Sequence, residues 1–392
     1  MRVLHVLPSL SPEWGGPVTV VAGLARAIKA KGVQFTVFAA QGRRVGIGAM
    51  PIDGVETQLF PTGSLSRFWT GHAPAMVEAL KRAVNDHDII HIHELWHFPH
   101  YAAYGVARQA RKPYVVTIHG QMDPWARRQK SLRKTIYMRA IQRRILQQAS
   151  SLHAITIDEA QQLRDQGLTV PVAVIPNGIS AEFFDPPRTR AGFLSRAPGL
   201  DGKRMILFLG RIHSKKGLDI LAEAFGNVAR LRDDVRLVIA GPDEGGYRSQ
   251  VEAMLRSASA LDKAVFTGML TGNDKLAAFS AADIFVLPSH SEVLGVATLE
   301  AMACGLPVVI SHQCQFPEVA DAGAGLIIDT DSKQLASSLI RLLDSPEERR
   351  EMGRQGRQLV QERYTWERVA DQMSQLYVDV LGAVSANTCH SH

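Results

Sequence analysis

Short apolar runs rich in β-branched residues alternate with longer amphipathic stretches along the whole chain. A strand–helix–strand succession forms a parallel sheet with right-handed crossover connections. In the first half the pattern predicts strands at residues 3–7, 34–39, 89–93, 114–118, 152–155 and 173–175, with helices between them, for example at 18–30, 73–83 and 134–148. The first half therefore predicts an α/β domain with a parallel sheet.

The same alternation starts again at residue 205. Strands are predicted at residues 205–209, 236–240, 264–267, 284–287 and 307–310, and helices at 217–230, 247–257, 274–280, 296–303, 332–343, 347–362 and 366–381. Turn and linker dipeptides separate the two halves: Asn177-Gly178, Pro186-Pro187 and Pro198-Gly199. We therefore expect two doubly wound, Rossmann-like domains, residues 1–180 and 181–365, followed by a last helix and tail at residues 366–392.

The composition is that of a folded globular protein, with 46% apolar and 21% charged residues. The longest stretch without charge, residues 301–317, contains Gly305 and Pro307 and is too short for a membrane-spanning helix. The N-terminus lacks the long apolar region of a signal peptide, and three scattered cysteines suit neither a disulfide framework nor a thiolate metal cage. We expect a cytoplasmic protein.

Charge is distributed unevenly along the chain. Residues 1–180 carry a net charge of +10 and the remainder −4, and residues 127–144 hold eight basic residues and no acidic one. Such a split favours a first half that faces an anionic ligand or the inner face of an anionic membrane, with a solvated helix face as the alternative. No nucleic-acid-binding signature accompanies the charge, so we expect no nucleic acid partner.

A glycine turn follows the first predicted strand. Gly15 and Gly16 allow close approach of the backbone, and Pro17 suits the first turn of the next helix. The N-terminus of a helix binds anions readily, so this turn is a candidate phosphate site. It matches neither the dinucleotide-binding nor the P-loop pattern, and a simple tight turn is the alternative.

The second half carries a basic pair at the corresponding place. Arg211 lies at the end of the strand at 205–209, and Lys216 lies at the start of the helix that follows. An arginine fork with a lysine nearby suits a diphosphate, although two solvated loop cations are also common.

Two glutamates stand eight residues apart beyond the strand at 284–287. Glu292 lies in the loop after this strand, and Glu300 lies about one turn into the helix that begins near Gly295. The helix N-terminus offers free N–H groups to a phosphate. A glutamate on an otherwise apolar helix face needs a partner, and the hydroxyls of a ribose would provide one.

Together these motifs resemble the retaining family-4 (group 1) glycosyltransferases of GT-B fold. The resemblance covers nearly the whole chain, and it rests on Gly-Gly-Pro at 15–17, His-Gly at 119–120, Pro-Asn-Gly at 176–178, GRIHSKKG at 210–217, and Glu292-x7-Glu300 followed by AMACGLPV. Val293 stands where the family often has a glycine. The resemblance implies two Rossmann-like domains facing across a cleft, with the last helix crossing back to the first domain.

The resemblance also implies roles for single residues. Glu300 would bind the ribose of a nucleotide-sugar donor, Arg211 and Lys216 its diphosphate, and Gly15 and Gly16 its phosphates from the first domain. Glu292 would lie at the donor sugar, as nucleophile or as electrostatic stabiliser, and His119 would contact sugar hydroxyls or the reaction centre. The remaining donor-binding candidates are Leu294, Gly295 and Val296, and the acceptor candidates are His93, Trp96 and Asp123.

Two metal motifs are present but poorly placed. Residues 93–97 match the zinc-protease pattern HExxH, but they follow a strand-like run and precede Pro99, whereas that motif needs a helix. Asp86-His87-Asp88 matches the metal-binding pattern Asp-x-Asp, but that pattern should follow a strand, and here it precedes one. We therefore expect no metal and no cofactor, with the basic pair and the helix N-terminus stabilising the leaving diphosphate.

The function implied by the resemblance is transfer of a sugar from a nucleoside-diphosphate sugar to a glycan or lipid-linked acceptor, in the biosynthesis of an exopolysaccharide, capsule or lipopolysaccharide. The basic first half fits an acceptor that carries phosphate. A transferase to a small soluble acceptor and a non-catalytic nucleotide-sugar-binding protein are the alternatives. The nucleotide, the sugar, the linkage and the oligomeric state stay open.

Overall fold

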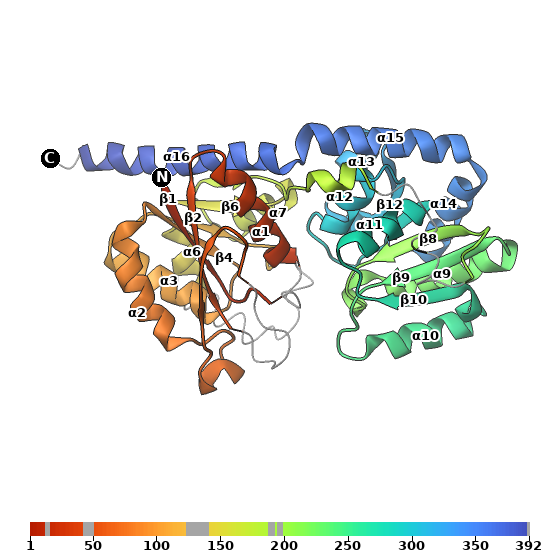
Figure 1. Cartoon of the computed structure of the whole chain (residues 1–392), viewed down its shortest axis with the longest axis horizontal. Coiled ribbons are helices and arrows are strands. Elements are labelled where there is room, and N and C mark those ends of the chain that lie inside the picture. The colour runs from red at the N-terminus through yellow and green to blue at the C-terminus, as the bar shows by residue number, and fades with distance from the viewer. Residues whose placement is uncertain (12–15, 42–50, 123–140, 187–192, 194–198, 390–392) are drawn as a thin grey trace. The chain divides into compact units, whose positions relative to one another are not determined.

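The computed structural model describes residues 1–11, 16–41, 51–122, 141–186, 193 and 199–389 (Figure 1). The chain divides into two compact units. The first unit comprises Met1–Gly178 together with Trp366–His392, and the second comprises Ile179–Thr365. Each unit contains one sheet in which all strand pairs are parallel, as the alternating pattern predicts.

The sheet of the first unit has seven strands in the order β3-β2-β1-β4-β5-β6-β7. The order reverses between β1 and β4, and ligands of such sheets bind beyond the carboxyl ends of the strands at this switch point. The strands are β1 Arg2–Leu7, β2 Gln34–Ala40, β3 Glu56–Phe60, β4 Ile89–His93, β5 Tyr114–Thr117, β6 Ser151–Ala154 and β7 Val172–Val174.

Helices cover both faces of this sheet. Leu4 and Ile90 point to one face, where they join the core cluster that α2 and α3 complete. The alternate residues of the same strands point to the other face, where α1 and α16 pack together, and Figure 1 shows α16 on the opposite side of the sheet from α2 and α3. The helices are α1 Gly16–Lys29, α2 Pro74–Ala83, α3 Phe98–Gln109, α6 Arg143–Gln147, α7 Ile157–Asp165 and α16 Trp366–Cys389.

Trp366, at the start of α16, packs between two glycines of the first unit. A Cβ atom on Gly23 would lie 2.1 Å from the indole ring, and one on Gly178 would lie 2.5 Å from it. Trp366 is buried as a result. The absence of side chains at these two positions is therefore what lets the indole dock.

The sheet of the second unit has six strands in the order β10-β9-β8-β11-β12-β13, with the switch point between β8 and β11. The strands are β8 Arg204–Leu209, β9 Val235–Ala240, β10 Ala264–Gly268, β11 Ile284–Leu287, β12 Val308–Ser311 and β13 Gly325–Ile328. The helices are α9 Leu218–Leu231, α10 Tyr247–Ser257, α11 Gly272–Ala281, α12 Val296–Ala303, α13 Glu318–Asp321, α14 Ser332–Asp344 and α15 Pro346–Arg363.

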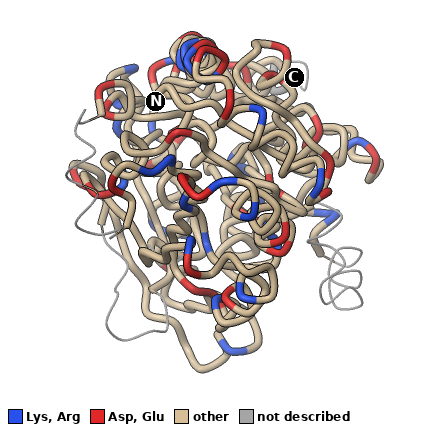
Figure 2. The backbone as a smooth tube through the Cα atoms, turned by 90° about the vertical axis from the view of Figure 1, so that its right-hand side faces the viewer, with Lys and Arg blue, Asp and Glu red and all other residues tan. Residues whose placement is uncertain are grey.

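Charges of both signs follow one another along the second unit (Figure 2). On α15 they form short-range exposed pairs, such as Arg350 with Glu347 and Arg354 with Glu351. Exposed pairs of this kind add little stability, but they neutralise the surface locally. Among the described residues, no helix is both long enough and apolar enough to cross a membrane.

The elements named from the sequence leave out two strands and, among the described residues, three helices, the shortest of which is the four-residue α13. In β3 (ETQLF) only Phe60 is fully buried, so this edge strand is mostly polar, and β13 is only four residues long and begins with glycine. Helix α3 contains Pro99 and Gly105, and α7 is strongly polar. Most of the helix predicted at 134–148 lies outside the described residues, and α6 is its described end.

The packing of Trp366 against Gly23 can be tested by comparing alanine substitutions at two glycines that both lie in helices. Gly23→Ala should destabilise the first unit by about 1–3 kcal/mol, because the new methyl group overlaps the indole. Gly105→Ala is the matched control: its Cβ meets nothing within 4 Å, and alanine should stabilise α3 by about 0.5–1 kcal/mol. Urea unfolding followed by tryptophan fluorescence measures both, and equal effects of the two changes would contradict the packing role of Gly23.

Candidate active site

The two loops at the switch point of the second unit are pressed together. Gly217 has a φ of 67°, and a Cβ atom there would lie 1.8 Å from the carbonyl oxygen of Pro288. Only glycine fits this contact. The backbone N–H of His290 also donates to the carbonyl of Lys215 at 2.8 Å. The β8–α9 loop and the β11–α12 loop therefore form one surface beyond the carboxyl ends of β8 and β11.

Lys216 and Glu292 join these loops by an ion pair. Burial opposes the ionisation of Glu292, but the charges of Lys216 and Lys215 outweigh it and hold the pKa of this carboxyl below its usual value. The N–H of Val293 also donates to Glu292 Oε1 at 3.2 Å. Two predicted site residues are thus brought into contact, and Glu292 is an anion at neutral pH.

Glu300 is held in a different environment on α12. Its side chain is 3% exposed, and Lys275 Nζ on α11 donates to Oε1 at 2.5 Å. The other oxygen, Oε2, is buried and accepts no hydrogen bond within the part of the chain that the structure describes. Burial raises the pKa of Glu300, although Lys275 counteracts this. A buried carboxylate oxygen with spare acceptor capacity is the kind of group that a ligand hydroxyl satisfies.

The remaining candidates of the second unit surround the start of α12. Leu294 has a φ of 43°, which is unusual for a residue with a side chain. Gly295 is the N-cap of α12, and Val296 is its first residue, so the free N–H groups of the helix start here. Arg211 lies apart from them in an exposed pair with Glu244, at 2.6 Å.

In the first unit, His119 and Gly120 follow β5 in a left-handed turn, with φ values of 52° and 73°. Glu159 holds this turn: its Oε1 accepts from the N–H of Gly120 at 2.5 Å and its Oε2 from the N–H of Ile155 at 2.7 Å. Strained backbone at a residue with a side chain is frequent at functional sites. The turn presents His119 beyond the carboxyl end of β5.

The loop after β4 is tied to the same turn. Glu94 and Trp96 have φ values of 64° and 69°. The N–H of Leu95 donates to Gln121 Oε1 at 2.6 Å. Trp96 therefore lies in a loop that is fixed to the His119–Gln121 segment, next to the switch point between β1 and β4.

His93 lies deeper than an acceptor contact requires. It is 3% exposed, and its two ring nitrogens bond to His5 and His119. His93 ends β4 and His97 precedes α3, so the HExxH residues do not share a helix face. Gly16 is the first residue of α1. Gly15, Asp123 and most of the basic stretch at 127–144 lie outside the described residues.

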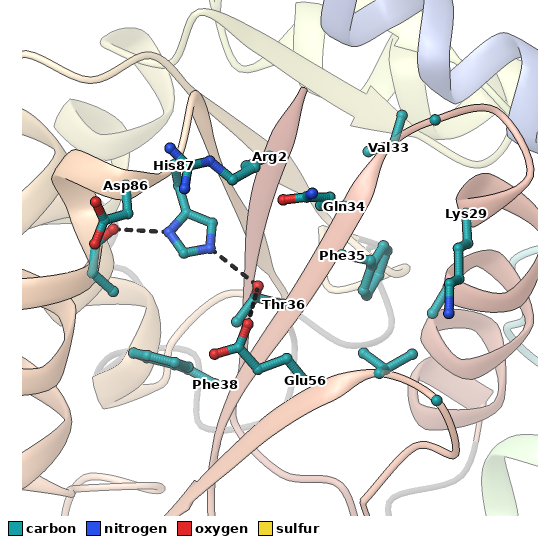
Figure 3. A pocket seen from close by; sticks show the side chains of 15 residues that line it. Arg2, Lys29, Val33, Gln34, Phe35, Thr36, Phe38, Glu56, Asp86 and His87 are labelled. Carbon is teal, nitrogen blue, oxygen red and sulfur yellow. Dashed lines mark hydrogen bonds between the residues drawn. The ribbon is translucent and has the colours of Figure 1, made fainter.

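A pocket of about 670 Å³ lies at the amino-terminal ends of strands of the first sheet, opposite to the carboxyl ends where the candidate site lies (Figure 3). It is lined by Arg2 and Gln34, which begin β1 and β2. Its buried Thr36 is hydrogen-bonded to His87 at 3.1 Å and to Glu56 at 3.2 Å. Because strands of a parallel sheet bind ligands at their carboxyl ends, this amino-terminal pocket is separate from the candidate site.

Two models of known protein families match this chain, one in each half. The profile described as glycosyl transferases group 1 matches residues 193–359, and that of the glycosyl transferase 4-like domain matches residues 15–178. The chain belongs to the group 1 glycosyltransferases, enzymes of GT-B fold. The predicted resemblance, the predicted fold class and the prediction of an enzyme are confirmed.

Individual proteins are similar to this chain over nearly its whole length. Phosphatidyl-myo-inositol mannosyltransferase of Mycobacterium leprae is 29% identical over 388 residues, which are 97% of each chain. Sucrose-phosphate synthase from Thermosynechococcus elongatus has a TM-score of 0.78 at 22% identity, covering 98% of this chain and 100% of that one. Anabaena HepE in complex with UDP-glucose has a TM-score of 0.79 at 18% identity, covering 97% and 100%.

Two residues of the site are missing from the sequence-based prediction. Lys275, the partner of Glu300, is 25 residues away on another helix, and no local pattern marks it. Glu159 had a signal: Thr156-x-x-Glu159 is a capping-box pattern, and Thr156 does cap α7 by accepting from the N–H of Glu159. The side chain of Glu159 reaches past its own helix to the His119 turn.

Burial of histidines makes the first unit sensitive to acid. Burial lowers the pKa of His5, His91 and His93 well below the usual value, that of His100 and His153 to about 4, and that of His119 to about 3. Below pH 6.5 the unfolded chain therefore binds more protons than the folded one. Stability is fully present above this pH and falls as the pH drops, by about 1.4 kcal/mol per pH unit for each histidine that stays neutral.

All five tryptophans of the chain belong to the first unit. Urea unfolding followed by tryptophan fluorescence at pH 7.5 and pH 5.5 therefore reports this loss of stability selectively. We expect a clearly lower midpoint at pH 5.5, and a midpoint that does not move would contradict the burial of neutral histidines.

Proposed function

We propose that this glycosyltransferase is a retaining enzyme that moves a sugar from a nucleoside-diphosphate sugar to a glycan or lipid-linked acceptor, in the biosynthesis of a polysaccharide. The observation that supports a nucleotide-sugar substrate is the state of Glu300 Oε2. This buried carboxylate oxygen lies one turn from the start of α12 and accepts no hydrogen bond from the described residues. The vicinal hydroxyls of a ribose supply such donors. Anabaena HepE, which shares the fold, was solved in complex with UDP-glucose, and this supports the same class of ligand.

The second unit would stabilise the leaving group. Breaking the anomeric C–O bond places negative charge on the nucleoside diphosphate. The N–H groups at the start of α12 and the cation of Lys216 lie on one loop surface, and Arg211 becomes available if its exposed pair with Glu244 opens. Fixed donors and cations directed at a developing charge are a large part of catalysis in enzymes.

Glu292 would act as an anion. Its pKa is held below the usual value, so it does not donate a proton at neutral pH. A carboxylate suits the oxocarbenium-like charge that develops on the donor sugar, either by electrostatic stabilisation or as a nucleophile, and both fit a retaining reaction. Its pairing with Lys216 couples the group that faces the sugar to a group that faces the diphosphate.

The acceptor is proposed to carry phosphate. The M. leprae relative is named for a phosphatidyl-inositol acceptor, and residues 1–180 of this chain carry a net charge of +10. Both support a lipid-linked, anionic acceptor met at the inner face of a membrane, where basic residues add about 1 kcal/mol each.

Glu300→Gln should weaken binding of a nucleoside diphosphate about 10- to 100-fold, because a hydrogen bond to a charged group contributes about 1.5–3 kcal/mol. Calorimetry with UDP, GDP and their 2′,3′-dideoxy forms measures the effect and identifies the base. Removing the ribose hydroxyls should cost the variant less than it costs the wild type. Glu252→Gln, a change at a partly exposed glutamate of α10, is the matched control, and an equal ribose effect in all three proteins would exclude Glu300 from the nucleotide site.

Transfer should not require a divalent cation, because cations and a helix N-terminus already face the expected diphosphate. The measurement is transfer or donor hydrolysis after exhaustive EDTA treatment, with Mn²⁺ and Mg²⁺ added back to separate samples. Activity that vanishes in EDTA and returns with either ion would overturn this proposal.

A further inference from the structure

A continuous chain of hydrogen bonds crosses the α16-facing side of the first sheet, from a backbone carbonyl to His119. It runs through His153, Thr117, His91, Tyr377, His5 and His93. The first three links, from the carbonyl end, are Ile175 O to His153 Nε2 at 2.8 Å, His153 Nδ1 to Thr117 Oγ1 at 2.8 Å, and Thr117 Oγ1 to His91 Nε2 at 2.6 Å. Tyr377 Oη joins the next two rings, at 2.6 Å from His91 Nδ1 and 3.4 Å from His5 Nε2. The last two links are His5 Nδ1 to His93 Nε2 at 2.9 Å and His93 Nδ1 to His119 Nε2 at 3.1 Å.

The strand register puts these side chains on one face. His5 on β1 pairs with His91 on β4, and His93 is two residues further along β4. His93 pairs with Thr117 on β5, which in turn pairs with His153 on β6. Tyr377 on α16 closes the gap between His91 and His5. The members of the chain between Ile175 and His119 are all buried.

The carbonyl of Ile175 fixes the direction of the first links, because a carbonyl can only accept. His153 must therefore carry its proton on Nε2, and its Nδ1 accepts. Burial lowers the pKa of His153 to about 4, so the ring is neutral at pH 7. Thr117 has one hydroxyl hydrogen and gives it to His153, so its oxygen accepts from the N–H at His91 Nε2.

The same reasoning passes on through Tyr377. His91 Nδ1 carries the lone pair and accepts the hydroxyl hydrogen of Tyr377. The oxygen of Tyr377 then accepts from the N–H at His5 Nε2. His5 Nδ1 accepts from His93 Nε2, and His93 Nδ1 accepts from His119 Nε2. Burial keeps His5, His91 and His93 neutral, since it lowers the pKa of each.

We propose that this chain sets the tautomer of His119, with the proton on Nε2 and the lone pair on Nδ1. Tyr377 is then a positioning residue, acting on His119 through His5 and His93. A lone pair on Nδ1 suits a hydrogen-bond donor such as a hydroxyl and disfavours an anion. Only this choice of ligand rests on the proposed function; the tautomer does not.

Two other uses of the histidines fit the geometry less well. A proton relay needs an outlet at each end, but this chain ends at a carbonyl, which holds no exchangeable proton. Nitrogens of His5, His91 and His93 lie within 4.8 Å of one another and could hold a metal ion. The hydrogen bonds above already engage both ring nitrogens of each, so a metal would have to displace them.

The test is nitrogen-15 spectroscopy of protein labelled at histidine, with the His119 signals assigned by loss in His119→Gln. The wild type should show the Nε2–H tautomer. Tyr377→Phe leaves the N–H at His5 Nε2 without an acceptor. Without this hydroxyl, the direction fixed at Ile175 no longer reaches His5. Reversing the tautomers of His5, His93 and His119 exchanges the orphaned N–H at His5 Nε2 for an unpaired lone pair, so neither direction keeps an advantage. The excess of the Nε2–H tautomer at His119 should therefore fall, and the Nδ1–H tautomer should become populated.

Thr117→Val is a second variant that acts from further along the chain. It removes the acceptor of His91 Nε2–H, so the direction fixed at Ile175 no longer reaches His91. In molecules where the tautomer of His91 reverses, Tyr377 donates to His5, and His119 takes the Nδ1–H tautomer. Tyr114→Phe and Thr36→Val are matched controls. Tyr114 donates to the carbonyl of Ile145 at 2.6 Å, and Thr36 bonds to His87, in both cases outside the chain.

The outcomes distinguish these alternatives. An Nδ1–H tautomer in the wild type overturns the proposal, and so does an unchanged tautomer in a folded Tyr377→Phe or Thr117→Val protein. Bound metal in the purified protein that shifts the signals of His5, His91 and His93 overturns it in favour of a metal site. In activity assays, Tyr377→Phe should lower kcat while nucleoside-diphosphate affinity is kept. A shifted tautomer with unchanged kcat would remove the link to the reaction and leave the tautomer assignment intact.

Discussion

The docking of Trp366 between Gly23 and Gly178 is the contact on which the first unit depends. It anchors α16 against a sheet whose strands come from the first 174 residues of the chain. The same helix then supplies Tyr377, which is fully buried beside His5 and His91. One aromatic residue thus holds the helix and a second one completes the polar row on the sheet, so packing and candidate chemistry share a single element.

The second unit uses backbone contact in place of aromatic docking. Gly217 brings two loops together so closely that Lys216 and Glu292 meet. Glu292 and Glu300 are eight residues apart, yet their pKa values move in opposite directions. Two lysines near Glu292 outweigh its burial, whereas one lysine bonded to a single oxygen of Glu300 does not. The two carboxylates are therefore suited to different tasks: a fixed anion and a hydrogen-bond acceptor.

The local sequence pattern predicted most strands and helices, because a parallel α/β fold alternates short apolar strands with amphipathic helices throughout. It also predicted the loops that hold the candidate site residues, because these loops follow buried strands. Lys275 and Tyr377 could not be found in this way, and the capping-box pattern at Glu159 marks the start of α7 but not the contact of its side chain with the His119 turn. Tyr377 is 286 residues from His91, and only the folded sheet brings them together. The alternation His91-Ile92-His93 did place two histidines on one strand face, but the pairing of β4 with β1 and β5 decides what they touch. Even so, the Pro-Asn-Gly motif includes Gly178, whose role is to receive Trp366.

The path of the chain has a consequence for its synthesis. Residues 179–365 form the second unit without interruption, whereas the first unit needs residues from both sides of that segment. At about 5–20 residues per second, roughly 10–40 seconds pass on the ribosome between the end of the first unit's opening segment and the appearance of Trp366. During that time His5, His91 and His93 have no tyrosine above them, and the face of the sheet that α16 covers is open. The half of the protein that is made first is thus the last to be completed.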